Sequence, residues 1–183
     1  MATTKLFTVE DVWEMGEDAR DELIEGVRHE MAAAGGRHGA VSGQFAGHLW
    51  ACGEQTGQGL VFAAETGFVI ERSPDTLLVP DVAFIKADRL PADGSPIGFV
   101  DLIPDVVLEV LSLSQSREQV LAKVRKYLGA GVPLIWVADP ESQTVTADTP
   151  KSSPRLDRAS DELDGGDVLT GFRVPLERFF RSP

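Results

Sequence analysis

The sequence predicts an α/β protein in which a mixed sheet is flanked by helices. Segments rich in valine, phenylalanine and isoleucine favour strands, and amphipathic stretches between them have the apolar spacing of helices. The run over residues 105–111 is apolar almost throughout, which is typical of a strand covered on both faces. We therefore expect this run to be central to the sheet.

The chain is expected to form one domain over residues 1–183. This length fits the single-domain range, and 43% hydrophobic with 25% charged residues is ordinary globular composition, not that of a disordered, collagen-like or coiled-coil chain. No run approaches the ~20 apolar residues of a membrane span, and residues 1–10 lack the pattern of a signal peptide. We therefore expect a cytoplasmic protein with no membrane partner.

The charge of the chain argues against a protein that coats nucleic acid. Asp and Glu number 29 against 17 Lys and Arg, giving a formal net charge of −12, which disfavours indiscriminate adhesion to phosphate backbones. A nuclease is still allowed, because a bound divalent cation can neutralise local carboxylates and itself hold a phosphate.

Two helices and one or two strands are expected before residue 56. Thr8, with Asp11 three residues on, predicts a short helix that begins with a capping box. Residues 23–31 predict one or two short strands with a turn at Gly26. A helix is expected over residues 38–55, because apolar residues at spacings of three and four share one face. These residues are Val41, Phe45, Leu49 and Cys52.

Residues 60–71 and 77–85 predict neighbouring strands, with a Ser-Pro-Asp turn between them. After the strand at 105–111, Ser112 or Ser114 can cap a helix over residues 115–128. A buried strand at 134–138, an edge strand at 144–147, a polar and mobile loop at 151–166, and a packed segment at 172–180 are expected to complete the domain.

Two carboxylates interrupt otherwise apolar strands: Asp81 and Glu109. Acidic side chains are almost never fully buried unless they are paired. Because adjacent strands lie ~4.8 Å apart, two such carboxylates can converge on one divalent cation, and Mg²⁺ prefers oxygen ligands while keeping waters for a substrate phosphate. A plainer explanation is that both acids lie at strand ends and accept backbone hydrogen bonds, or pair with Arg37 or Arg72.

A series of motifs in a fixed order resembles the Uma2 family of restriction-endonuclease-type proteins, within the PD-(D/E)xK nuclease superfamily. The resemblance covers nearly the whole chain. The matching stretches are residues 22–26 (ELIEG), 36–39 (GRHG), 64–68 (AETGF), 80–84 (PDVAF), 104–112 (PDVVLEVLS), 130–132 (AGV), 136–140 (WVADP) and 163–169 (LDGGDVL).

The resemblance implies a restriction-endonuclease-like fold and metal-dependent cleavage of nucleic acid, DNA in the first instance. Asp81 and Glu109 match the metal-binding acids of the family, with Mg²⁺ as the cofactor and Mn²⁺ as an alternative. The superfamily pattern has a lysine two residues after the second acid, where this chain has Leu111. The resembling family supplies the lysine from the following helix, in a Lys-x-x-x-Tyr arrangement that matches Lys123 and Tyr127.

Helical geometry is consistent with Lys123, and not Lys126, as the catalytic lysine. Periodicity alone favours a plainer explanation, a boundary lysine that only covers apolar surface, and the Lys-x-x-x-Tyr match reverses that preference. At 100° per residue Lys123 borders an apolar stripe, so its ammonium can reach the sheet, whereas Lys126 points roughly opposite. The stripe is formed by Val120, Leu121, Val124, Tyr127 and Leu128. A lysine near the acids would stabilise the charge that develops on the phosphate.

Three more residues within the matched motifs are candidate accessory groups: Glu22, His38 and Glu65. Each could supply a further metal ligand, orient a water or contact a phosphate. The alternatives are purely structural roles, in which His38 caps its helix and Glu65 pairs with a neighbouring strand.

Two functions are therefore carried forward: a Mg²⁺-dependent endonuclease, and a non-catalytic binding or assembly protein that retains the nuclease fold. A positive cleft beside Asp81 favours the nuclease, and a wholly acidic rim favours the binding protein. A homodimer is expected, because restriction-type nucleases often act as two-fold pairs and three Trp with nine Phe are available for an interface.

Overall fold

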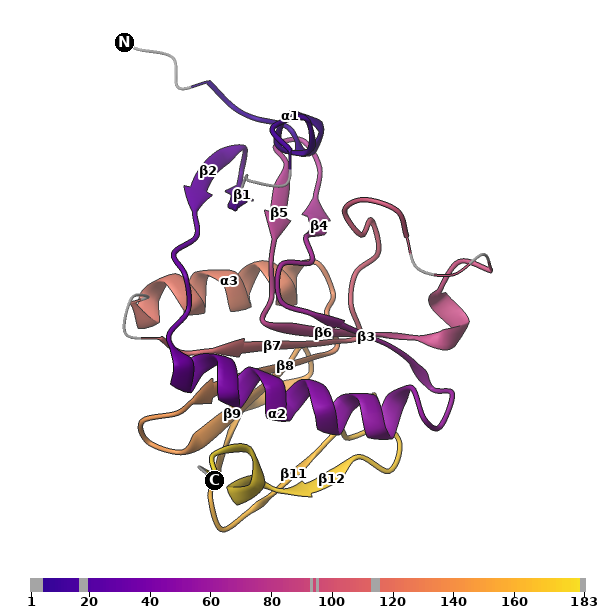
Figure 1. Cartoon of the computed structure of the whole chain (residues 1–183), viewed down its shortest axis with the longest axis vertical. Helices are drawn as coiled ribbons and strands as arrows, with labels where there is room; N and C mark the ends of the chain where they lie inside the picture. Colours follow the sequence, from indigo (N-terminus) through magenta and orange to yellow (C-terminus); the bar gives the residue numbers. More distant parts are fainter. Residues whose placement is uncertain (1–4, 17–19, 93, 95, 113–115, 182–183) are drawn as a thin grey trace.

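The computed structural model contains a six-stranded sheet with helices on both faces (Figure 1). It describes residues 5–16, 20–92, 94, 96–112 and 116–181. From edge to edge the strands are β10 (Ser152–Arg158), β9 (Thr144–Thr149), β8 (Leu134–Asp139), β7 (Val106–Val110), β6 (Val82–Lys86) and β3 (Gly59–Ala63). Strands β7 and β8 are parallel and the other neighbouring pairs are antiparallel. The predicted α/β class with a mixed sheet is confirmed.

Strand β7 lies inside this sheet, as the apolar run predicts. All five of its residues are buried, because β6 and β8 cover its two edges and a hydrophobic core forms on each face. Leu108 faces the core that contains α2 (Gly36–Gly53), and Val107 faces the core that contains α3 (Arg117–Gly129). Glu109 alternates with Leu108 and so points towards the side of α3.

Helices α1 and α3 each begin with a capping box. In α1 (Val9–Glu14) the predicted capping box between Thr8 and Asp11 is present. Helix α3 begins with a second capping box, in which the Ser116 side chain accepts from the Gln119 amide. Ser116 therefore caps this helix instead of Ser112, and the other predicted cap, Ser114, lies outside the described residues. Within the described ranges no helix is long and apolar enough to cross a membrane.

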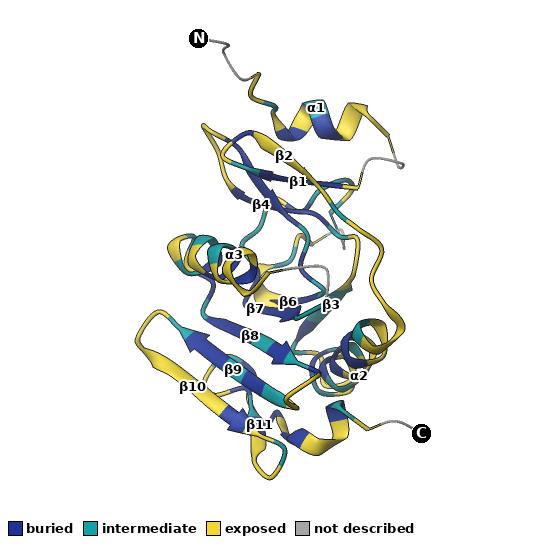
Figure 2. Cartoon of the chain, turned by 90° about the vertical axis from the view of Figure 1, so that its left-hand side faces the viewer, coloured by how far each residue is buried: buried dark blue, intermediate teal, exposed yellow. Residues whose placement is uncertain are grey.

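A second, four-stranded antiparallel sheet packs above α3, on the face of the large sheet opposite α2 (Figures 1 and 2). Its order is β2 (Val27–Glu30), β1 (Asp21–Ile24), β5 (Thr76–Leu78) and β4 (Phe68–Glu71). The strands predicted over 60–71 and 77–85 are therefore each divided between the two sheets. Strand β6 continues into a short 3-10 helix, Ala87–Arg89.

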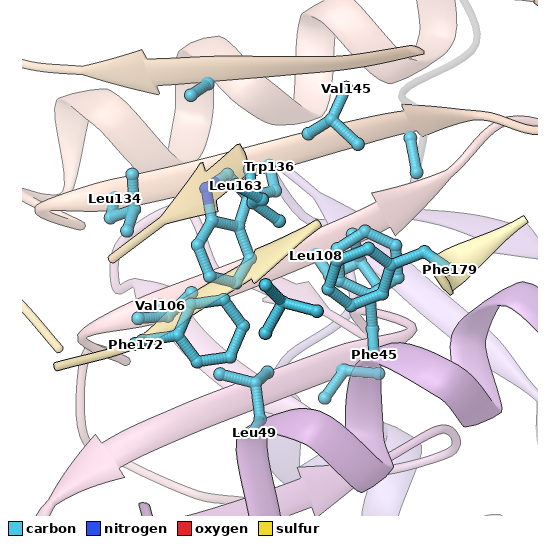
Figure 3. Packing of buried hydrophobic residues seen from close by; sticks show 14 of the residues in the cluster. Phe45, Leu49, Val106, Leu108, Leu134, Trp136, Val145, Leu163, Phe172 and Phe179 are labelled. Carbon is cyan, nitrogen blue, oxygen red and sulfur yellow. The ribbon is translucent and has the colours of Figure 1, made fainter. Parts of the chain in front are cut away.

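Aromatic residues close the core between α2 and the C-terminal segment (Figure 3). Phe45 stacks on Phe179 with ring centroids 4.0 Å apart, and Trp136 lies 5.2 Å from Phe172. The segment itself comprises the strand pair β11 (Glu162–Asp164) and β12 (Arg173–Pro175), followed by the 3-10 helix Leu176–Phe179. The predicted packing of residues 172–180 is confirmed.

Two expectations near the C-terminus are corrected. Residues 144–147 belong to β9, which is not an edge strand, because β10 pairs with it. Residues 151–166, expected to be a loop, contain β10 and β11. The cause is the exposure of β10 at the sheet edge (Figure 2), where six of its seven residues face solvent and no apolar alternation marks the strand.

Candidate active site

Adjacent strands bring Asp81 and Glu109 together. Strands β6 and β7 pair in antiparallel register with Val82 opposite Leu108, and one step further places Asp81 opposite Glu109. The carboxylate oxygen Oδ2 of Asp81 accepts a hydrogen bond of 2.7 Å from the amide of Val110. The two carboxylates that sequence analysis singled out are therefore neighbours at one end of the strand pair.

Lys123 reaches these acids from α3. Its side chain is 6% exposed, and its Nζ lies 2.8 Å from Oε1 and 2.9 Å from Oε2 of Glu109. The buried positions of the helix are Val120, Lys123, Val124 and Tyr127, so Lys123 lies within the packed face and not at its border. Leu121, predicted to belong to that face, is instead 51% exposed.

Lys126 lies away from the acid pair, as helical geometry predicts. Its ammonium contacts two carboxylates of the neighbouring sheet, 2.6 Å from Glu25 and 3.5 Å from Glu71. Both partners are exposed. Lys126 therefore forms ion pairs with exposed acids, whereas Lys123 on the same helix forms buried ones.

Glu22 is a further buried partner of Lys123. It lies on β1 and is 6% exposed, and its Oε1 is 2.8 Å from the Lys123 Nζ. The same oxygen accepts a 2.8 Å hydrogen bond from the amide of Val79. Sequence analysis did not predict the Lys123 contact, although an acid beside the apolar pair Leu23 and Ile24 is a signal of burial.

Tyr127 completes the contacts of Glu109. Its buried hydroxyl donates a 2.9 Å hydrogen bond to Glu109 Oε1. Burial, reinforced by the negative charge of Glu109, raises the pKa of Tyr127 well above its ordinary value. The phenol therefore keeps its proton and remains a hydrogen-bond donor.

His38 also joins the site, but Glu65 does not. His38, in the first turn of α2, places Nε2 3.1 Å from Asp81 Oδ2, and this hydrogen bond raises the pKa of the imidazole. The α2 N-cap is Gly35, so His38 does not cap the helix. Glu65 is exposed and pairs with Arg20 at 3.2 Å.

The plainer explanation of the two acids, that they accept backbone hydrogen bonds at strand ends or pair with an arginine, is only partly correct. Asp81 does accept a backbone amide, but Glu109 pairs with Lys123 and not with an arginine. Arg72 binds acids elsewhere, at Glu10 and Asp101 among others. A lysine held by two buried glutamates is a different arrangement from an ordinary strand-end ion pair.

Burial dominates the electrostatics of Glu109. It raises the pKa of this carboxyl to about 7 against the lowering effect of Lys123, and the charges of Asp81 and Glu22 raise it further. Burial and the neighbouring acids therefore favour the protonated form of Glu109 in the metal-free protein, and Lys123 favours the ionised form. Added positive charge at this position would favour the ionised form.

Replacing Glu109 by glutamine should make the stability of the metal-free protein less dependent on pH. The folded protein keeps the Glu109 proton up to about pH 7, whereas an ordinary glutamate loses it near pH 4.5, so the wild-type fold loses stability as pH rises between those values. Glutamine removes this loss. The free energy of unfolding of Glu109→Gln should therefore rise relative to that of wild type as pH increases across this range, by at most on the order of 3 kcal/mol.

Urea unfolding in EDTA at pH 5 and pH 8 measures this difference. Glu118→Gln, at an exposed acid on α3, is the matched control and should show little change between the two pH values. A difference between Glu109→Gln and wild type that is equal at both pH values would contradict the raised pKa.

The chemistry of the donor set fits a hard divalent cation. Carboxylate oxygens of Asp81 and Glu109 are the ligands that Mg²⁺ prefers, and Mg²⁺ commonly takes one or two carboxylates and completes its shell with water and substrate. Among the described residues no cluster of three His, Cys, Asp or Glu is suited to hold a metal. Asp81 and Glu109 offer two carboxylates to such a cation, with the rest of its shell left to water and substrate.

A cavity of about 640 Å³ opens beside His38. Its wall carries the basic residues Arg37 and Arg117 together with the acids Asp139 and Glu141, so it is neither the positive cleft nor the wholly acidic rim. Arg117 and Asp139 pair at 3.1 Å. The lining is formed by Ala33, Gly35, Arg37, His38, Leu111, Ser112, Arg117, Asp139, Pro140 and Glu141.

Comparison with known proteins identifies a family and solved structures with the same fold. The model of the Uma2 family, described as "Putative restriction endonuclease", matches residues 9–177. A crystal structure of "a putative nuclease belonging to DUF820" from Anabaena variabilis ATCC 29413 superposes with a TM-score of 0.84 at 21% identity. The match covers 95% of this chain and 97% of that chain, and it shows a shared fold. Among curated proteins none matches this chain.

Proposed function

The chain belongs to the Uma2 family, the "Putative restriction endonuclease" family, and on this basis we propose that it is a metal-dependent nuclease that hydrolyses phosphodiester bonds in nucleic acid. The observation that carries the proposal is the meeting of Asp81, Glu109 and Lys123 at one end of β6 and β7. Two carboxylates and a buried lysine combine a cation-binding pair with a fixed positive charge for a phosphate.

Asp81 and Glu109 are the residues that would hold the cation, with Mg²⁺ or Mn²⁺ as the ion. When bound, such an ion supplies Lewis-acid charge and lowers the pKa of water. Tyr127 donates to Glu109 and so fixes the orientation of that carboxylate. His38 fixes Asp81 in the same way at the cavity.

Lys123 supplies positive charge to the phosphate in this proposal. Strong electrostatic pairing with two glutamates raises the pKa of Lys123 despite its burial, so the ammonium stays charged. A preorganised charge in a site shielded from water stabilises developing negative charge more than the same group does in solution.

The cavity beside His38 is the proposed entry for the phosphate backbone. Arg37 and Arg117 on its wall can contact phosphate oxygens. Asp139 and Glu141 repel phosphate and so restrict where the backbone can bind in the cavity. DNA is the first candidate substrate.

A cytoplasmic location and a homodimer stay predictions. Light scattering tests the homodimer, and a mass near 19.7 kDa, that of one chain, would contradict it.

A cleavage assay tests the proposal against the non-catalytic alternative, which the net charge of −12 favours. Single- and double-stranded DNA and RNA are incubated with the protein and Mg²⁺ or Mn²⁺. We expect cleavage of at least one substrate, its loss in EDTA and its recovery when the metal is restored. Binding of nucleic acid or of metal without cleavage of any substrate would favour the binding protein.

A further inference from the structure

We infer that Glu22 is a positioning residue for the proposed reaction: it holds the Lys123 ammonium while Glu109 turns its oxygens to a cation. The inference rests on the proposed function, because it assigns a task to Glu22 at that same site. It differs from a role as a third metal ligand, in which Glu22 would touch the cation itself.

The first step of the argument is the double attachment of Lys123. Its Nζ lies 2.8 Å from Oε1 of Glu22 and 2.8 Å from Oε1 of Glu109, and both carboxylates are nearly buried. Leaving a buried ammonium without an anionic partner is strongly destabilising. Lys123 can therefore leave Glu109 only if another buried acceptor keeps it, and Glu22 is already in place.

The second step is that Glu22 is itself fixed. Its Oε1 receives the Val79 amide as well as the Lys123 ammonium, so the carboxylate is tied to the backbone of the segment that leads into β6. Asp81 lies two residues after Val79. One oxygen of Glu22 thus sets the position of Lys123 relative to the segment that carries Asp81 and leads into β6.

The third step is competition at Glu109. Both of its oxygens lie within 2.9 Å of the Lys123 ammonium, and Tyr127 donates to one of them. A divalent cation at Glu109 and the Lys123 ammonium repel each other at such distances. With Glu22 charged, Lys123 has a second anion to stay with. In Glu22→Gln that second anion is absent, so Lys123 is drawn more strongly to Glu109 and opposes cation binding.

A double-mutant cycle on Mn²⁺ affinity tests this coupling, with titration calorimetry as the readout. Glu22→Gln keeps a side-chain oxygen for the Val79 amide but removes the charge, and it should weaken Mn²⁺ binding about tenfold. In a Lys123→Met background, where no ammonium competes for Glu109, Glu22→Gln should change Mn²⁺ affinity less than about twofold. Glu25→Gln, at an exposed acid that pairs with Lys126, is the matched control and should bind Mn²⁺ as wild type does.

Each other outcome overturns the inference in an identifiable way. Equal weakening in both backgrounds would make Glu22 a direct metal ligand, and unchanged affinity in both would make it purely structural. Absence of Mn²⁺ binding by wild type would overturn the proposed function and the inference with it. If Glu22→Gln does not fold, Glu22→Asp, which withdraws the carboxylate from Lys123, should weaken Mn²⁺ binding and lose that effect in the Lys123→Met background.

Discussion

Replacing Lys123 by methionine should slow cleavage by a factor of ~100 to 1000 and leave Mn²⁺ binding in place. Methionine keeps the length and apolar stem of the side chain but removes the positive charge that lies 2.8 Å from Glu109. Removing one preorganised group that stabilises transition-state charge typically costs a factor of ~100 to 1000 in rate. Single-turnover cleavage measures the loss, and calorimetry measures Mn²⁺ affinity on the same preparation.

Lys126→Met is the matched control, because Lys126 lies on the same helix with exposed carboxylate partners. It should cleave within about twofold of wild type, since surface substitutions have small effects. Lys123→Met should also lower the free energy of unfolding without metal by about 3 kcal/mol, because it leaves Glu22 and Glu109 without their buried counter-charge. Full cleavage by a folded Lys123→Met protein would remove the lysine from the reaction.

Strong local patterns predicted the elements that support this site. The run of β7, apolar except for Glu109, indicates burial on both faces, and a strand buried on both faces is expected to have neighbours on both edges, so its interior position follows. Spacings of three and four in α2 and α3 likewise predict which faces pack. Leu121 shows the limit of that reasoning, because helical geometry cannot tell how wide the covered face is.

The division of two predicted strands between two sheets could not be read from composition. Residues 60–71 favour a strand almost throughout, but the chain turns out of the large sheet between β3 and β4. Glu65 there has a φ of 73°, and a side chain at Gly67 would lie 2.6 Å from the Phe99 ring. These positions give the AETGF motif a conformational role, whereas sequence analysis considered Glu65 for a chemical one.

The site residues that could be predicted are those marked by a pattern within a single strand or helix. Asp81 and Glu109 stand out as acids within apolar strands, and Lys123 stands out by its position on the helix. The contact of Glu22 with Lys123 was not predictable, because it joins β1 to α3 across two separate layers. The His38 contact with Asp81 was not predictable either, because it depends on how α2 packs beside the start of β6.

Asp81→Asn should remove both Mn²⁺ binding and cleavage. Asparagine keeps the size of the side chain and can still accept the Val110 amide, but it removes one of the two anionic donors of the proposed site. We expect a loss of more than about 1000-fold in cleavage, because the loss of metal affects both water activation and phosphate charge. Asp101→Asn, at a carboxylate that is 70% exposed and pairs with Arg72, should bind Mn²⁺ and cleave as wild type does. Calorimetry and cleavage on the same samples decide the matter: tight Mn²⁺ binding by a folded Asp81→Asn protein would place the metal elsewhere.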